Sequence, residues 1–398
     1  MGGGGGCVIE TISLEAYQKK VGIKVMTVDT NTDTYTFVSG TSHTIKCYNI
    51  EFAKNDKLVI AEGANVILER TLTIEKETNS IIRIDNNGTF TIEDGSKIIF
   101  GIITGDGAIG INNTSKDTLI INKDSEISIE GVKNFARGIK NNEGTCNING
   151  NITIDTIDGN FINDFKQTIG IDNSSNSVFE IHNDATITIK NINGYDEDVE
   201  INNQSSPVTY GIYNNSSFML NKNASIKIVN ILGKKYSTTS GIVNFISNTE
   251  EATFSINGKI MIDTIEGGQG DKSKTYGIAN YSNNIIMNDD DDDDDDDASI
   301  TIKNIIGYKL NDSETIGIYL LYQGLLIINS NGSIDIEDGN DENTYGIFSD
   351  VVNGLNNNGT IKVSENLEYP YADSLGNEVN SPIADNSNNF TGDGGYSY

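Results

Sequence analysis

The sequence predicts an all-β chain folded as a right-handed parallel β-helix, a β-solenoid with three short strands in each coil. Three observations lead to this fold class: the composition is dominated by isoleucine and asparagine, a Gly-Ile step returns along the chain, and an Ile-x-Ile motif follows each step. Such self-similarity is typical of repeat proteins, in which each unit packs only against its neighbours.

The composition favours strands joined by tight turns. The 398 residues include 61 Ile, against 15 Leu and 13 Ala. β-Branched Ile fits a pleated, half-buried surface, whereas Leu and Ala favour helices. Turns must come from the 53 Asn, the 41 Gly and the Asp residues, because the chain has only three Pro.

The Gly-Ile step recurs at intervals of 28 to 41 residues between Gly110 and Gly346. In six copies an asparagine follows two residues after the isoleucine, at Asn113, Asn141, Asn173, Asn214, Asn244 and Asn280. Equivalent positions of successive coils stack, so we expect these side chains to form a hydrogen-bonded ladder. A ladder would satisfy amides that are otherwise costly to bury, which predicts a structural role for all six.

The second motif alternates isoleucine with polar residues, which is the pattern of a strand with one buried face. Its copies begin at Ile127, Ile152, Ile187, Ile226, Ile260, Ile300, Ile334 and Ile361. A third short apolar patch, such as Phe218-Met219-Leu220, lies between the two motifs. Three strands per repeat, each with one inward face, describe a coil that stacks on the next at about 4.8 Å. A β-sandwich fits less well, because its strands come from short hairpins.

The repeat divides the chain into four segments. Residues 1–22 are a glycine-rich leader followed by a short helix, expected at Ser13 to Val21, that could cap the solenoid. Residues 23–105 are less regular N-terminal coils, and residues 106–363 are the repetitive β-helix. Residues 364–398 are polar and are expected to form a mobile tail.

The charge excludes some partners. The formal net charge is −30, with 27 basic against 57 acidic residues. Nucleic-acid binding requires phosphate neutralisation by Lys and Arg, so it is not expected. No apolar stretch approaches the roughly 20 residues of a membrane helix, so no membrane span is expected. Cys7, Cys47 and Cys146 form no metal-binding or disulfide pattern, and free or buried thiols are expected.

A run of nine aspartates interrupts one repeat. It comprises Asp289, Asp290, Asp291, Asp292, Asp293, Asp294, Asp295, Asp296 and Asp297. A block of like charge is normally a solvated insertion, and the mixed ligands and glycine of an EF-hand loop are absent. We therefore expect no cofactor and no structural metal, with loose divalent-cation binding as the alternative.

Candidates for catalysis are few. His43 and His182 lie in separate repeats, so a histidine pair for zinc or base chemistry is not expected. The outward position after each Ile-x-Ile strand places Asp155 beside Lys190, and Asp263 beside Lys303, on adjacent coils. Such stacked opposite charges are ordinary cross-strand pairs, with a sugar-binding stripe as the alternative.

Tyrosine precedes three of the repeat glycines, at Tyr210, Tyr276 and Tyr345. These rings could pack between coils as cross-strand aromatics or line one corner as a sugar-stacking column. The chain has no Trp, so tyrosine would have to supply any such stacking.

The phrases from Tyr210 to Asn215 and from Ala298 to Asn304 resemble the degenerate repeats of autotransporter-type adhesin passengers and related surface-displayed β-helices. The resemblance covers residues 110–363. It implies surface display, adhesion and a rigid stalk. We therefore expect a non-catalytic structural or adhesive β-helix on an extracellular, cell or virion surface, with an unknown protein or glycan ligand and an open oligomeric state. The alternatives are a polysaccharide-active β-helix of the tailspike or lyase kind and a cation-binding matrix protein.

Overall fold

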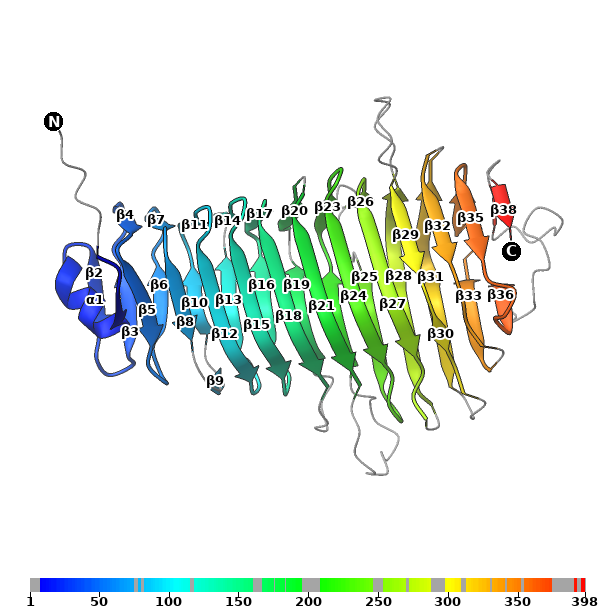
Figure 1. Cartoon of the computed structure of the whole chain (residues 1–398), viewed down its shortest axis with the longest axis horizontal. Coiled ribbons are helices and arrows are strands. Elements are labelled where there is room, and N and C mark those ends of the chain that lie inside the picture. Colours follow the sequence, from blue (N-terminus) through cyan, green and yellow to red (C-terminus); the bar gives the residue numbers. More distant parts are fainter. Residues whose placement is uncertain are drawn as a thin grey trace.

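The strands stack side by side along one axis as a right-handed parallel β-helix (Figure 1), so the predicted fold class is confirmed. The structure is a computed structural model. It describes residues 8–74, 78–79, 82–114, 118–159, 167–174, 176–182, 184–194, 208–245, 253–269, 272–287, 298–308, 313–329, 331–340, 342–351, 354–373, 390–391 and 395–397.

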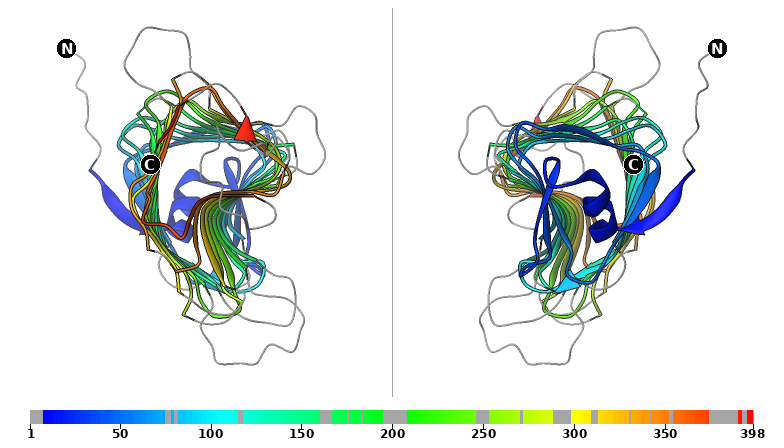
Figure 2. Two further views of the ribbon diagram at one scale, coloured as in Figure 1. Left: turned by 90° about the vertical axis from the view of Figure 1, so that its right-hand side faces the viewer. Right: turned by 90° about the vertical axis from the view of Figure 1, so that its left-hand side faces the viewer.

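Each coil contributes one strand to each of three walls, which enclose a common interior (Figure 2). A 15-stranded sheet forms wall A, and a 23-stranded sheet forms walls B and C. The pairing between the described strands is parallel, apart from the antiparallel hairpin of β2 and β3 at the N-terminal end. Three strands per coil match the sequence prediction.

Wall A carries the Ile-x-Ile motif. Its strands are β1 (Glu10–Ser13), β5 (Tyr48–Phe52), β8 (Thr71–Ile74), β9 (Thr78–Asn79), β12 (Lys97–Thr104), β15 (Glu126–Lys133), β18 (Asn151–Asp158), β21 (Thr186–Asn193), β24 (Ser225–Leu232), β27 (Lys259–Glu266), β29 (Ser299–Ile302), β30 (Ile305–Ile306), β32 (Ser333–Ile336), β35 (Thr360–Val363) and β38 (Gly395–Ser397).

Wall B carries the Gly-Ile step. Its strands are β2 (Met26–Asp29), β3 (Thr34–Phe37), β6 (Lys57–Ile60), β10 (Ile82–Asn86), β13 (Ile109–Thr114), β16 (Arg137–Asn142), β19 (Gln167–Ser174), β22 (Val208–Asn214), β25 (Thr238–Phe245), β28 (Lys274–Met287), β31 (Glu314–Ile328), β33 (Thr344–Ser349) and β36 (Tyr369–Asp373).

Wall C carries the third apolar patch. Its strands are β4 (Ser42–Ile45), β7 (Asn65–Leu68), β11 (Thr89–Ile92), β14 (Thr118–Ile121), β17 (Thr145–Ile148), β20 (Val178–Ile181), β23 (Ser217–Leu220), β26 (Phe254–Ile256), β34 (Leu355–Asn357) and β37 (Phe390–Thr391). The long strands β28 and β31 continue from wall B into wall C, where they pair with β26 and β34.

The interior is built from stacked isoleucines. The first Ile of each wall A motif pairs in register with its equivalent on the next coil, from Ile127 on β15 to Ile361 on β35. These side chains are buried. Burying an Ile side chain contributes about 1.5–3 kcal/mol, so the repeated column is a main source of stability.

The repeat glycine brings wall B into direct contact with wall A. A Cβ on Gly277 would lie 2.6 Å from the carbonyl oxygen of Gly317 and 2.6 Å from Cδ1 of Ile265. The other glycines of this column meet the same two kinds of atom. Only glycine lets the backbones approach this closely. In the end-on views, one side of the coil accordingly bends toward the interior (Figure 2).

The first coils lack this glycine. The register of β10 with β13 places Arg83 opposite Gly110. The Arg83 side chain is fully buried, and its Nη1 donates a hydrogen bond to the Asp56 carbonyl oxygen at 2.7 Å. On β10 a long buried side chain therefore takes the place of the repeat glycine.

The helix expected near Ser13 forms α1 (Leu14–Val21) at the N-terminal end of the solenoid (Figure 1). Ser13 Oγ accepts a hydrogen bond from the Ala16 amide at 3.1 Å, which caps the helix. Leu14 and Tyr17 are buried against the first coil. Among the described residues, no helix is both long and apolar enough to span a membrane.

Two sequence expectations need correction. The polar tail was placed from residue 364 onward, but β36 still pairs with β33, and Tyr371 on β36 is buried. Tyr369 stacks on Tyr345 with ring centroids 4.8 Å apart, and Tyr371 pairs with the inward Ile347, so wall B continues into this segment for one more coil. Cys146 is a free buried thiol as expected, whereas Cys47 is disulfide-bonded. Wide spacing along the sequence cannot exclude a disulfide, because folding brings distant residues together.

Candidate functional site

A pair of carboxylates lies on the outer side of wall A. Ile129 pairs with Ile154, and Gly131 pairs with Thr156, so Glu130 and Asp155 stand opposite each other on β15 and β18. Both belong to the outward column that the sequence analysis had singled out. Adjacent strands are about 4.8 Å apart, which brings two negative charges close together.

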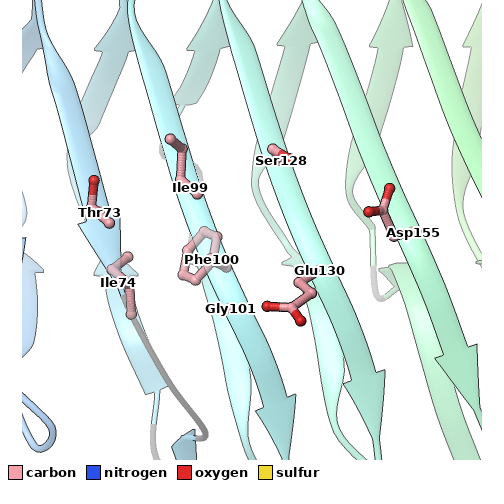
Figure 3. Close-up of a pocket in the computed structure, with 8 residues that line it drawn as sticks. All are labelled: Thr73, Ile74, Ile99, Phe100, Gly101, Ser128, Glu130 and Asp155. Carbon is pink, nitrogen blue, oxygen red and sulfur yellow. The ribbon is translucent and has the colours of Figure 1, made fainter.

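A hollow of about 360 Å³ lies beside this pair (Figure 3). Gly101 on β12 occupies the next position in the same outward column, and its missing side chain helps to open the hollow. Thr73, Ile99 and Ser128 contribute to the lining. The hollow therefore combines two carboxylates, two hydroxyls and an apolar patch, which are groups that suit a polyhydroxylated ligand.

Lys190 on β21 neutralises one member of the pair. Its Nζ lies 2.7 Å from Oδ1 of Asp155, and the two side chains are about half exposed. The second pairing predicted from the sequence is present as well, with Lys303 Nζ 2.8 Å from Asp263 Oδ1. Both predicted cross-coil pairs are confirmed. Exposed pairs contribute about 0–1 kcal/mol each to the free energy of unfolding, so these two add little stability. Their effect is to balance opposite charges along the wall.

The hollow is a weak setting for acid–base chemistry. A general acid that works near neutral pH needs a carboxyl group shielded from water. Glu130 is exposed, and Asp155 is half-exposed and held by Lys190. His43 is bound to the Tyr17 hydroxyl at 2.7 Å, and His182 lies on wall C near Glu180 at 3.6 Å. Neither histidine lines the hollow.

The asparagines of the Gly-Ile-x-Asn step are buried in one column. Each Nδ2 donates to Oδ1 of the next asparagine at 2.7–2.9 Å, in a chain that starts one coil before the first predicted member and comprises Asn86, Asn113, Asn141, Asn173, Asn214, Asn244 and Asn280. Asn280 ends the chain by donating to the Leu325 carbonyl, because Leu320 occupies the next position.

The aspartates Asp289–Asp297 lie outside the described residues, so the alternative of loose cation binding there stays a prediction. Among the residues that the structure does describe, no group of three or more His, Cys, Asp or Glu side chains could hold a metal ion.

The sequence analysis missed a buried threonine column. A threonine precedes the repeat glycine by two residues in six coils, at Thr168, Thr209, Thr239, Thr275, Thr315 and Thr344, and all six are buried. They face a second glycine column at the corner, where a Cβ on Gly233 would collide with Oγ1 of Thr275. The recurring Thr-x-Gly spacing was the signal that could have revealed it.

Comparisons with known proteins give little guidance to function. No protein-family model matches the chain, and no curated protein matches it. One solved structure that is similar is the crystal structure of the periplasmic alginate epimerase AlgG, at 13% identity, with 83% of this chain and 82% of that chain covered and a TM-score of 0.27. A likeness this distant carries no information on reaction or ligand. The resemblance to autotransporter-type adhesin passengers stays a prediction.

Proposed function

We propose that this protein is a non-catalytic β-helix that serves as a rigid structural or adhesive rod on a cell or virion surface. The observation that carries the proposal is the unbroken stack of wall B, whose strands pair coil to coil from β10 to β36. Ten such strands at about 4.8 Å span roughly 45 Å. A repetitive interior of this length gives a stiff element with large lateral surfaces.

The outer charges support a non-catalytic role. Along wall A, acidic and basic side chains on neighbouring coils compensate one another, as in the pairs Lys97–Glu126, Lys190–Asp155 and Lys303–Asp263. A catalytic site needs groups held in an environment that changes their reactivity. Compensated, solvated charges favour solubility and surface display instead.

The test is incubation of the full chain with a broad polysaccharide panel, with retention and new products measured in parallel. We expect retention of at least one polysaccharide without new reducing ends or unsaturated products. Products would contradict the proposal. If the chain neither retains a polysaccharide nor forms products, the structural form of the proposal remains, and the search would turn to protein partners.

The second candidate is a polysaccharide-active β-helix, and the hollow beside Glu130 and Asp155 is the observation that favours it. If this candidate is correct, Glu130→Gln and Asp155→Asn would each abolish product formation and leave retention intact. Lys227→Gln is the matched control, because Lys227 also faces outward on wall A but lies outside the hollow.

A further inference from the structure

The outer side of wall B bends at each repeat glycine. Tyr210 and Tyr213 flank Gly211 on β22, and their rings stack with centroids 5.7 Å apart. In a regular strand, residues three apart point to opposite faces. The glycine step resets this alternation, so both rings lie outside the coil, in a cluster separate from the interior core. Side chains that converge across a bend mark its concave side, so the outer surface is concave here.

Further along wall B this concave surface is lined by a connected set of rings, which we call the aromatic trough: Phe245, Tyr281, Tyr319, Tyr322, Tyr345 and Phe348. Neighbouring rings in this set have centroids 5.3–6.3 Å apart. The trough follows the solenoid axis across β25, β28, β31 and β33. Three coil spacings at about 4.8 Å give a length of roughly 15 Å.

The floor of the trough is small and rigid. Val243 and Ala279 occupy consecutive positions of the same outward column as Tyr213 and Tyr319, and both are buried. Beside them, the Tyr276 ring packs 4.9 Å from the Tyr319 ring, and its hydroxyl donates to Glu314 at 2.6 Å. These contacts hold the Tyr319 ring in place, so at the floor a ligand would meet a preformed surface.

The rim of the trough is accessible. Tyr322 is 72% exposed and Phe245 is 40% exposed, while the other four rings are half-buried. Burial raises the pKa of Tyr281 and of Tyr345 to about 12, so both hydroxyls keep their protons and remain donors at neutral pH. Contiguous exposed aromatic surface on a soluble protein usually marks an interaction site.

The charge around the trough selects among ligands. Lys274, next to it on β28, is already paired with Glu314 at 3.1 Å. Asp350, which is exposed, lies near Tyr319, and the whole chain carries a net charge of −30. An anionic ligand would be repelled, and a second copy of this chain would bring its own 30 excess negative charges.

A long, concave, rigid surface of rings and hydroxyls suits a linear polymer that has apolar C–H faces and hydroxyl edges. C–H groups carry partial positive charge and stack on the negative faces of aromatic rings. We propose that the aromatic trough binds an uncharged polysaccharide chain laid along the solenoid axis. The proposal rests on the adhesive form of the proposed function and names the class of its ligand.

The experiment measures binding of oligosaccharides of equal length to the full chain: uncharged glucan, xylan, mannan and galactan, a galacturonate oligomer and a glucosamine oligomer. Because the chain has no Trp, its intrinsic emission comes mainly from its 17 tyrosines, and the four in the trough are expected to respond to a bound oligomer. We expect at least one uncharged oligomer to bind with little dependence on salt. The Phe245→Ala/Tyr322→Ala double variant should weaken that binding about tenfold or more.

Two matched controls separate the trough from general surface effects. Ile23→Ala removes an exposed apolar side chain from the N-terminal end of the solenoid, where Ile23 is 74% exposed and lies outside both the trough and the hollow. Lys140→Ala changes the same outward column of wall B on β16, a strand without aromatic residues. Both variants should bind like the parent chain. Unchanged melting of all variants would show that they fold.

Three outcomes would overturn the proposal: no uncharged oligomer binds, only a charged oligomer binds, or the double variant binds as the parent does. Self-association that Tyr322→Ala abolishes, measured by sedimentation, would likewise overturn it in favour of a second copy. Product formation would contradict the non-catalytic function but not the trough. If no oligomer binds, the proposal for the trough is wrong, and the structural form of the proposed function remains.

Discussion

Wall B repeats the Gly-Ile step from β13 to β33 but has two different outer surfaces. Around β16 and β19 the outward positions hold Arg137, Lys140 and Asp172, and Arg137 Nε binds Asp172 Oδ2 at 2.6 Å. On β22 the equivalent positions hold Tyr210 and Tyr213. The column of Tyr213 continues through the small residues Val243 and Ala279 to Tyr319 in the aromatic trough. The glycine bend runs through both parts, and the asparagine ladder extends into the second part as far as Asn280. The interior therefore specifies the coil, while the outer positions are free to differ and carry the surface that distinguishes one region from the other.

The largest expected effect tests whether the interior is equivalent in the two parts. Gly138→Val and Gly277→Val should each destabilise the protein by at least about 3 kcal/mol, because the new Cβ would lie 2.6 Å from the next glycine carbonyl in both cases. Denaturant unfolding combined with hydrogen exchange would measure this. Gly131→Ala is the control, since its nearest neighbour is 3.6 Å away. If the two substitutions lower the free energy of unfolding by clearly different amounts, the interior is not equivalent in the two parts.

A smaller effect is expected in the asparagine ladder. Asn141→Ala, in the polar part, removes donors to Asn173 Oδ1 and the Val178 carbonyl, each at 2.9 Å, and the acceptor for Asn113. Leaving these buried hydrogen-bond partners unsatisfied should lower the free energy of unfolding by about 2–3 kcal/mol. Asn214→Ala should cost a similar amount in the aromatic part. Thermal unfolding of both variants provides the measurement, and a neutral substitution at either site would refute the structural role of the ladder.

Alkaline pH should separate the two parts. Burial raises the pKa of Tyr213, Tyr281 and Tyr345 to about 12, against about 10 for an unfolded tyrosine. A raised folded pKa gives stability that is present below pH 10 and is lost as the pH rises toward 12. Coils between residues 82 and 194 contain no tyrosine. Hydrogen exchange from pH 9 upward should loosen residues 208–373 before residues 82–194, and simultaneous loosening of these two parts would contradict this.

The smallest expected effect is that of metal removal. Chelation with EDTA should leave the melting temperature unchanged, because the described residues stack without a metal-ligand cluster. A fall in melting temperature would instead favour the cation-binding alternative. The matching variant replaces the aspartates at positions 289–297 with asparagine and should melt like the parent chain.

Much of the fold was predictable because inward residues must repeat. The isoleucine period indicated the strands of wall A, and the even register of the outward column indicated the Lys190–Asp155 pair. The aromatic trough was only partly predictable. Tyr210, Tyr276 and Tyr345 were noticed, but simple in–out alternation cannot bring Tyr213 beside Tyr210, because the glycine bend is a property of two packed walls. The hollow depends on Gly101, whose importance is visible only once Glu130 and Asp155 stand beside it.

The ladder of asparagines also has a direction. Each side-chain amide donates toward the C-terminal coil, so the seven dipoles from Asn86 to Asn280 point the same way. Aligned amides polarise one another, so the members in the middle of such a chain bind more strongly than those at its ends. The solenoid thus contains a chain of aligned amide dipoles from β10 to β28. Removing an asparagine in the middle would divide the hydrogen-bonded chain into two shorter chains. Loss of the first or last asparagine would leave the remaining hydrogen bonds almost unchanged.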